Sequence, residues 1–377
     1  MATTPVDPRV IEKMCRYLGP DGCFGNPASM THVYGRQAAE AVEHARQQIA
    51  ATVHAGPEEI IFTSGATEAN NLAILGAAAF YHHKGKHVIT LQTEHKSVLD
   101  SFNQLEKEGY KVTYLQPMSD GLLNLDTLRA ALTEETLLVS IMHANNEIGV
   151  VQDIAAIGAL LKKKGVLFHV DAAQSAGKLP INLDQWPVHL MSFSAHKNYG
   201  PKGIGALYVR NRPRVRLTPL SFGGGQERGL RSGTLATHQI VGMGEAFALS
   251  ERLREQEQAH ILKMRQKLWN GIKGLSGIKL HGHEEKRIAG NLNLTFAGIS
   301  GESLLNALDR LALSTTSACA AASAQPSYVI SALGNDQITA INAIRISLGR
   351  FTREIDVPEI IALISKAHHD LSNPVKK

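Results

Sequence analysis

Two segments of the chain decide its fold: Val166-Leu167-Phe168-His169-Val170-Asp171-Ala172-Ala173-Gln174 and Ser192-Phe193-Ser194-Ala195-His196-Lys197. The first is an apolar strand pattern that ends in a carboxylate, and the second places a lysine in a Ser-x-His-Lys turn. Such a lysine can hold the aldehyde of pyridoxal phosphate (PLP) as a Schiff base, while the carboxylate pairs with the pyridinium nitrogen so that the ring can take up carbanion charge. Lys197 alone could equally be a surface lysine after a buried strand. The combination favours a PLP site, with Ser194 and His196 placed to contact the phosphate.

The same succession of apolar strand and polar turn recurs along the chain. Short apolar segments end in polar turns at residues 59–63, 87–90, 137–141, 166–170 and 204–209, and a helix-like segment follows the first of them at 70–81. Strands that alternate with helices predict a mostly parallel sheet covered on both faces. Ligands of such sheets bind beyond the carboxyl ends of the strands, which is where the polar turns fall.

A second, smaller domain is expected after this sheet, because a chain of 377 residues suggests about two domains. A helical pattern without proline at about 244–275 is the expected connector. Beyond it the sequence predicts strands at 291–296 and 344–348, a helix at 301–313 and a loop of small residues at 314–327.

Composition and charge argue against several classes of protein. Lys and Arg number 39 against 34 Asp and Glu, and this net charge of +5 is dispersed and does not argue for direct nucleic-acid binding. No apolar run reaches membrane-spanning length and no signal-peptide pattern opens the chain, so we expect a cytoplasmic protein without membrane contact. Three cysteines without a Cys-x-x-Cys pattern argue against a disulfide framework or a metal site.

Other polar turns supply candidate ligands. Ser64-Gly65-Ala66-Thr67 opens a helix, where backbone N–H groups favour a phosphate; an ordinary helix cap is the alternative. His95 follows a strand and could stack on the cofactor ring and carry protons, although a lone histidine is more often structural. Asn146 could bond the ring hydroxyl or a substrate carboxylate, or be a turn asparagine. Arg345, in an apolar strand, could grip that carboxylate or form an internal salt bridge.

Two further segments carry candidate chemistry. The glycine-rich residues 223–229 lead to Arg231-Ser232-Gly233-Thr234, an anion-friendly loop that could serve this chain's site, serve a neighbour's site, or simply lie at the surface. Cys319 lies among small residues, which suits an accessible nucleophile better than a core residue. A nearby base or positive charge must then activate its thiol. An inert small cysteine is the alternative.

Together these motifs resemble those of the cysteine desulfurases of the housekeeping iron–sulfur type, within the class V aminotransferases. The resemblance covers nearly the whole chain and rests on a combination of motifs: Phe24-Gly25-Asn26-Pro27-Ala28-Ser29, Thr63-Ser64-Gly65-Ala66-Thr67-Glu68, Ser194-Ala195-His196-Lys197, Arg231-Ser232-Gly233-Thr234 and Ser317-Ala318-Cys319. It implies an α/β fold, the PLP-dependent transferase fold of aspartate aminotransferase. A large domain at 7–254 would hold the cofactor on a mostly parallel seven-stranded sheet, and a smaller α+β domain at 255–377 (with 1–6) would carry the catalytic cysteine loop.

The resemblance also implies a role for each candidate residue. Lys197 would form the internal aldimine and remove the Cα proton of L-cysteine; the thiolate of Cys319 would then attack the substrate sulfur, keep it as a persulfide and release L-alanine. The cofactor contacts would come from Ala66, Thr67, His95, Asn146, Asp171, Gln174, Ser194 and His196 and, across a homodimer, from Thr234 of the partner subunit. The substrate would be positioned by Asn26, Asn146 and Arg345. Cys319 would pass sulfur to an iron–sulfur scaffold protein or another acceptor, with tRNA thiolation as a further destination, and is a candidate transient iron–sulfur ligand.

The sequence departs from the family pattern at four places. The resemblance begins inside the family's Asp-Ala-Thr-Thr motif, so we expect the strand before it to be missing. The chain ends soon after Leu371-Ser372, where relatives carry a longer tail that docks the scaffold protein. Thr316 replaces a glycine, and Ala320 and Ala321 replace Thr-Ser. The other candidate functions are a selenocysteine lyase or another class V enzyme, and a PLP-binding paralogue with little turnover.

Overall fold

A computed structural model describes residues 2–315 and 325–373, and its larger sheet has seven strands in the order β1-β7-β6-β5-β4-β2-β3. The strands are β1 (Ile60–Thr63), β2 (His87–Leu91), β3 (Lys111–Leu115), β4 (Thr136–Ser140), β5 (Leu167–Asp171), β6 (Leu190–Ser194) and β7 (Gly205–Val209). Neighbouring strands are parallel from β6 to β3, whereas β7 is antiparallel to both β6 and β1. The expected α/β fold with a mostly parallel seven-stranded sheet is therefore confirmed.

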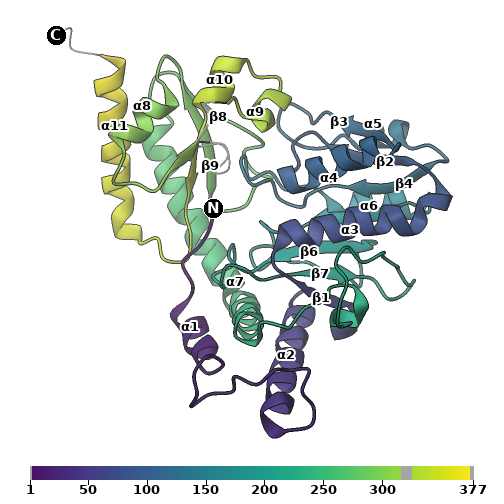
Figure 1. The fold of residues 1–377 in the computed structure, drawn as a ribbon. Coiled ribbons are helices and arrows are strands. Elements are labelled where there is room, and N and C mark those ends of the chain that lie inside the picture. Colours follow the sequence, from purple (N-terminus) through teal and green to yellow (C-terminus); the bar gives the residue numbers. More distant parts are fainter. Residues whose placement is uncertain (1, 316–324, 374–377) are drawn as a thin grey trace.

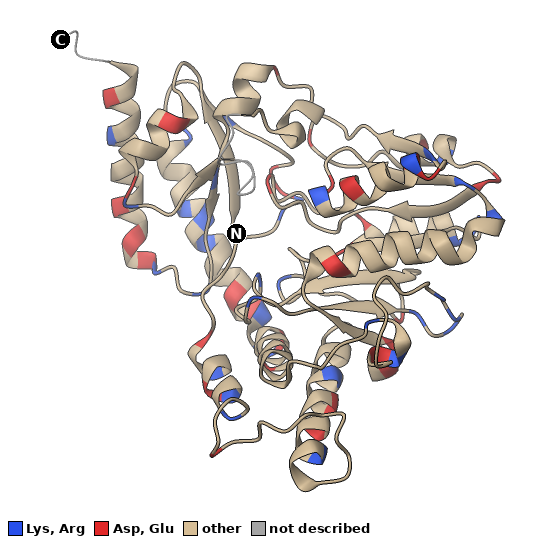
Figure 2. Ribbon diagram, in the orientation of Figure 1, with Lys and Arg blue, Asp and Glu red and all other residues tan. Residues whose placement is uncertain are grey.

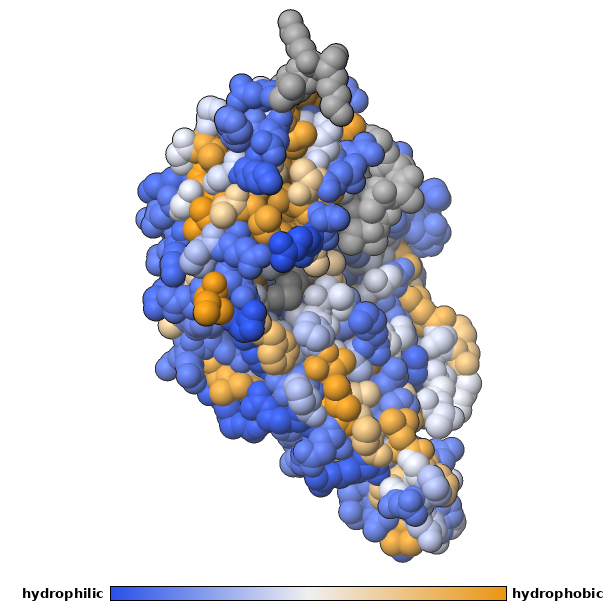
Figure 3. Space-filling model, turned by 90° about the vertical axis from the view of Figure 1, so that its left-hand side faces the viewer, coloured by the Kyte–Doolittle hydropathy of each residue, from blue (hydrophilic) through white to orange (hydrophobic). Residues whose placement is uncertain are grey.

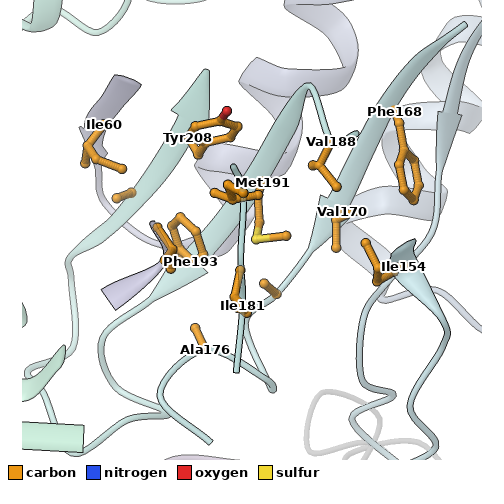
Figure 4. Close-up of a cluster of buried hydrophobic side chains, with 14 of the residues drawn as sticks. Ile60, Ile154, Phe168, Val170, Ala176, Ile181, Val188, Met191, Phe193 and Tyr208 are labelled. Atoms are coloured by element: carbon orange, nitrogen blue, oxygen red, sulfur yellow. The ribbon is translucent and has the colours of Figure 1, made fainter. Parts of the chain in front are cut away.

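Helices cover both faces of this sheet (Figure 1). One face packs against α3 (Ala66–Tyr81) and α4 (Lys96–Lys107), and the other against α2 (Val33–Thr52), α5 (Leu125–Ala131), α6 (Ile154–Lys162) and the first half of α7 (Thr237–Ile272). Figure 4 shows side chains of neighbouring strands, among them Val170, Met191 and Phe193, gathered in the apolar core between the sheet and the helices of the second face. Burial on both faces explains why the strands read as continuous apolar runs.

A second, antiparallel sheet lies beside the first, with the strand order β10-β11-β9-β8. Its strands are β8 (Ile278–Leu280), β9 (Asn291–Phe296), β10 (Ser314–Thr315) and β11 (Ile344–Ser347), and the helices around it are α8 (Gly301–Ala307), α9 (Tyr328–Ala332), α10 (Gln337–Asn342) and α11 (Val357–Ser372). The second half of α7 packs with α8, α11 and this sheet in a separate apolar core. The predicted helix at 301–313 was too long, because the chain leaves α8 after Ala307 to pair β10 with β11.

Helix α7 begins at Thr237, seven residues before the predicted start at 244. Gly242 and Gly244 lie inside the helix, and their lack of a side chain serves packing. A Cβ on Gly244 would lie 2.7 Å from the Cα of Ala45 in α2. A Cβ on Gly242 would lie 2.7 Å from the sulfur of Met14, which is in the last turn of α1 (Pro8–Cys15). The glycines therefore allow three helices to approach closely, and they do not mark a helix end.

Lys and Arg residues are interspersed with Asp and Glu residues along the elements (Figure 2). Within residues 2–315 and 325–373, no helix is long and apolar enough to cross a membrane. The same residues contain no group of three or more His, Cys, Asp or Glu side chains that could hold a metal ion.

Candidate active site

A cavity of about 470 Å³ lies at the carboxyl ends of the parallel strands. Its lining includes most of the residues predicted from the sequence: Ala66, Thr67, His95, Asn146, Asp171, Gln174, Ser194, His196, Lys197 and Arg345. Arg345 comes from β11, and the other residues lie at the ends of five strands of the larger sheet or in the segments that follow them. The carboxyl ends of parallel strands share one edge of a sheet, which is why residues so distant in sequence meet here. The volume is within the range usual for small-molecule sites.

Asp171 ends β5 and is 5% exposed. Its Oδ1 accepts a hydrogen bond from the backbone N–H of Ala173 at 2.8 Å, and its Oδ2 accepts one from Nδ2 of Asn70 at 2.8 Å. These two donors hold the carboxylate in one orientation. The sequence did not single out Asn70. The available signal was its position in α3, one turn after the predicted phosphate-binding residue Ala66 and so on the same helix face.

His95 caps α4 and belongs to the same hydrogen-bond network. Its Nδ1 accepts the backbone N–H of Ser97 at 3.1 Å and lies 2.8 Å from the Ser97 hydroxyl. That hydroxyl accepts from Asn70 at 2.9 Å, so its own proton is directed at the imidazole. Burial lowers the pKa of His95, Asp171 opposes the shift and Lys197 adds to it. The imidazole is therefore neutral near pH 7 and carries its proton on Nε2.

The amino end of α3 opens on the cavity through Ser64, Gly65, Ala66 and Thr67. The N-cap residue Gly65 provides no side-chain cap, so the first N–H groups of this 16-residue helix present its positive end. The Ser64 N–H donates to Oε2 of Glu68 at 2.6 Å. Glu68 therefore occupies the Ser64 donor, and the uncapped N–H groups at the start of α3 are the ones that fit an anion at this end of the cavity.

His196 lies on the same rim of the cavity. Its Nδ1 is 3.0 Å from the Thr3 hydroxyl, and its carbonyl oxygen accepts the Thr4 N–H at 2.8 Å. Burial lowers the pKa of His196 to about 4, and Lys197, Lys202 and Lys178 add to the shift. His196 is thus a neutral hydrogen-bonding group beside a cluster of amines.

Arg345 enters the cavity from β11 and is 3% exposed. Its Nη1 donates to the carbonyl oxygen of Asn146 at 2.6 Å, and its Nη2 donates to the Ser314 hydroxyl at 3.0 Å. Within the described part of the chain, Nε of Arg345 and Oδ1 of Asn146 are buried without a hydrogen-bond partner. Unpaired buried polar atoms are costly, so this donor and this acceptor indicate where a ligand would bind.

Glu147 lies beside Arg345 and is fully buried. Burial raises its pKa to about 7, while a hydrogen bond from Ser327 at 2.6 Å and the charge of Arg345 oppose the shift. Ser314 and Ser327 stand on either side of Cys319 in the sequence. Arg345 of the cavity and its neighbour Glu147 therefore bind the described residues that flank the Cys319 segment, one on each side.

Two of the predicted site residues that the structure describes are not among those that line this cavity. Asn26 and Thr234 instead line a second cavity of about 300 Å³, next to the buried ion pair of Arg46 and Glu227. Cys319, like Thr316, Ala320 and Ala321, lies outside the described residues. Tyr328, which the sequence did not single out, lines the Lys197 cavity, and its hydroxyl donates to the carbonyl oxygen of Glu94 at 2.8 Å. The sequence feature that could have identified Tyr328 is that it is an aromatic residue directly after the small-residue loop.

The larger cavity has the parts that PLP needs: a lysine amine, a fixed carboxylate for the pyridinium nitrogen, and a helix amino end for the phosphate. The unpaired Asn146 and Arg345 atoms leave polar positions for an amino-acid substrate. The fold and the site together define a PLP-dependent enzyme. The chain belongs to the aminotransferase class V family, whose model matches residues 1–360, and PLP is the cofactor of that family.

Relatives with named activities extend this assignment. The chain is 58% identical to the protein named cysteine desulfurase IscS of Shewanella loihica over 366 residues, which cover 97% of this chain and 91% of that one. It is equally similar, at 58% over 366 residues, to cysteine desulfurase IscS of Vibrio campbellii. Among solved structures, a NifS-like protein superposes with a TM-score of 0.90 at 37% identity and covers 98% of this chain and 97% of its own. A structure described as SspA in complex with cysteine gives a TM-score of 0.81 at 38% identity, covering 93% of this chain and 98% of its own.

Proposed function

We propose that this protein is a cysteine desulfurase that converts L-cysteine to L-alanine, keeps the sulfur as a persulfide on Cys319 and supplies it for iron–sulfur cluster assembly. The observation that carries the proposal is the single cavity in which Lys197, Asp171 and Arg345 converge. The relatives named cysteine desulfurase, which match nearly the whole chain, support the same activity.

Different residues of the cavity would bind different parts of the cofactor. Lys197 would provide the amine that attaches it, and Asp171, held by its two donors, would pair with the pyridinium nitrogen. The amino end of α3 at Ala66 and Thr67 would bind the phosphate, with Ser194 and His196 completing the phosphate site. His95 and Gln174 would contact the ring. When bound, PLP supplies an acceptor for the electron pair released at the substrate Cα.

The substrate is held and cleaved by a second set of groups. Arg345 and Asn146 bind and orient the carboxylate of L-cysteine. Nζ of Lys197 removes the Cα proton. The thiolate of Cys319 then attacks the substrate sulfur, so that an S–S bond forms as the substrate C–S bond breaks, and the carbon product is protonated and leaves as L-alanine. The persulfide sulfur passes to a scaffold protein or another acceptor, and we propose that this takes place in the cytoplasm.

One experiment on the purified protein tests this function. An absorbance scan is followed by addition of L-cysteine with a thiol reductant, and alanine and sulfide are measured. We expect the absorbance band of lysine-bound PLP and equal amounts of alanine and sulfide. A band without alanine would contradict the desulfurase proposal and favour a PLP-binding paralogue, and the absence of a band would contradict cofactor binding at Lys197.

We also propose that the protein is a homodimer and that Thr234 completes the cofactor site of the partner subunit. In the single chain Thr234 lies with Asn26 around the second cavity, away from Lys197. Large apolar side chains are exposed nearby in the sequence, including Phe24 at 60%, Met30 at 57% and Tyr34 at 55%. Figure 3 shows hydrophobic residues at the surface towards the lower end of the molecule, where α1 and α2 lie. Exposed apolar groups of this kind are typical of subunit interfaces.

The dimer is checked by sedimentation. We expect twice the chain mass, and the variant Phe24→Asp combined with Met30→Asp should shift the protein towards a monomer that loses PLP on dialysis, because a site completed by the partner is then incomplete. The matched control is Ile355→Asp, which changes a 79% exposed side chain next to α11. A fully PLP-loaded monomer would contradict the role of Thr234.

The division into domains at 7–254 and 255–377 (with 1–6) is likewise our proposal. The boundary falls inside α7, between Leu249, which packs against α1, and Ile261, which packs in the core of the smaller sheet.

A further inference from the structure

Lys178 is a largely buried amine just behind the cofactor cavity. Its Nζ donates to Oε1 of Gln174 at 3.1 Å. The two residues are joined by a tight turn in which Gly177 has φ +74° and packs so closely on Asn198 that a Cβ would lie 2.3 Å from its Nδ2. The turn therefore fixes where Lys178 lies relative to Gln174, and substitution of Gly177 would displace both.

The chemistry of the two groups determines which way the Gln174 amide faces. While Lys178 is protonated its amine has only donors, so the amide of Gln174 turns its oxygen towards Lys178 and its nitrogen away from it. Gln174 lines the Lys197 cavity, whereas Lys178 does not. Without such a partner, the two ends of a glutamine amide are nearly equivalent in shape and either can face a ligand.

We propose that Lys178 is a positioning residue that directs the amide nitrogen of Gln174 at the ring oxygen of the cofactor. This rests on the proposed function, in which Gln174 contacts the ring. A donor there stabilises negative charge on the ring oxygen, which then competes less strongly for the proton on the Lys197 nitrogen. Nothing in the described part of the chain gives Lys178 an acidic partner within ion-pair distance, so its hydrogen bond to Gln174 is its principal polar contact.

The charged groups around Lys178 limit this role to pH values at which its amine is protonated. Burial lowers the pKa of Lys178 to about 7, and the charges of Lys197 and Arg345 add to the shift. Lys178 in turn contributes to the lowered pKa of His196. Glu257 and Tyr199 line a small cavity together with Lys178, and Gln174 is not among the residues that line it. Lys197 and Arg345 therefore disfavour the ammonium form of Lys178, and its donor-only state holds below that pKa.

The test is a pH titration of the cofactor absorbance of the holoenzyme, without substrate. Lys178→Met should raise the midpoint of the absorbance change by about one pH unit, the size expected for loss of one hydrogen bond to a charged group. Gln174→Ala should raise it by a similar amount, and the double variant should add nothing further, because both changes remove the same donor. Lys162→Met, at an exposed lysine at the end of α6, is the control and should leave the midpoint unchanged.

Additive shifts, or an unchanged midpoint in Lys178→Met, overturn the proposal. Should Lys178→Met fail to hold the cofactor, Lys178→Arg answers the question: it keeps a donor-only cation beside Gln174, so the midpoint must stay at the wild-type value, and a rise equal to that of Gln174→Ala overturns the proposal. A wild-type protein without any cofactor band would contradict the proposed function instead, so the two failures are distinguishable.

Discussion

Replacing Cys319 by serine should lower the formation of alanine and sulfide from L-cysteine by at least about 10³-fold, because a hydroxyl near pH 7 cannot supply the thiolate that attacks the substrate sulfur. Binding of the cofactor should survive, because none of the cavity-lining residues that hold it is changed. The measurement is alanine and sulfide production by purified Cys319→Ser, with an absorbance scan and a thermal unfolding curve on the same sample.

The chain provides a matched control for that experiment. Cys15 is exposed at the end of α1, and Cys15→Ser should keep the wild-type rate. Sulfide production by Cys319→Ser at the wild-type rate would contradict the assignment of the nucleophile and leave the lyase alternative in its place. A loss of the cofactor band in the same variant would show that the rate had fallen for a different reason.

Arg345→Gln should lower kcat/KM for L-cysteine by about 30- to 150-fold, mainly through a higher KM. The guanidinium is buried, lines the cavity and presents donors to a carboxylate, and losing such charge-assisted hydrogen bonds costs about 2 to 3 kcal/mol. The cofactor absorbance should be unchanged, since the proposed cofactor contacts lie on other elements. Steady-state kinetics over a range of L-cysteine concentrations separate KM from kcat.

Arg345→Lys distinguishes the carboxylate role from a structural one. Lysine keeps the charge but lacks the planar fork, so it should recover only part of the affinity for L-cysteine. Arg345 also donates to Asn146 and Ser314, so some loss of thermal stability is expected in both variants. If Arg345→Gln were destabilised but kept its KM, Arg345 would be a structural link between the two sheets and not a substrate ligand.

The sequence predicted those parts of the site that depend on position along the chain. Asp171 and Lys197 follow apolar runs, and the parallel sheet brings both to one edge. Asn70 and Ser97 were not found, because their role comes from contacts across space: one side chain of α3 touches both Asp171 and the residue that polarises His95. No local pattern distinguishes such an asparagine from any other buried one.

Some of the predicted boundaries of helices and strands were wrong for related physical reasons. Residues 192–197 were quoted for their lysine turn, and the strand Leu190–Ser194 was not predicted, although as β6 it lies inside the sheet between β7 and β5. The start of α7 was misplaced because glycines within a helix look like a helix end unless the neighbouring helix that needs the space is known. In both cases the deciding contact lies far away along the chain.

The 36-residue helix α7 has a mechanical consequence. At 1.5 Å per residue it is a rod about 54 Å long, and its two halves belong to different apolar cores. Any rotation of the smaller sheet, and of Arg345 with it, must bend this rod, since no loop interrupts it. If either core unfolded, the apolar face of half of the helix would be exposed to water. The two sheets and their helices are therefore expected to unfold as one cooperative unit.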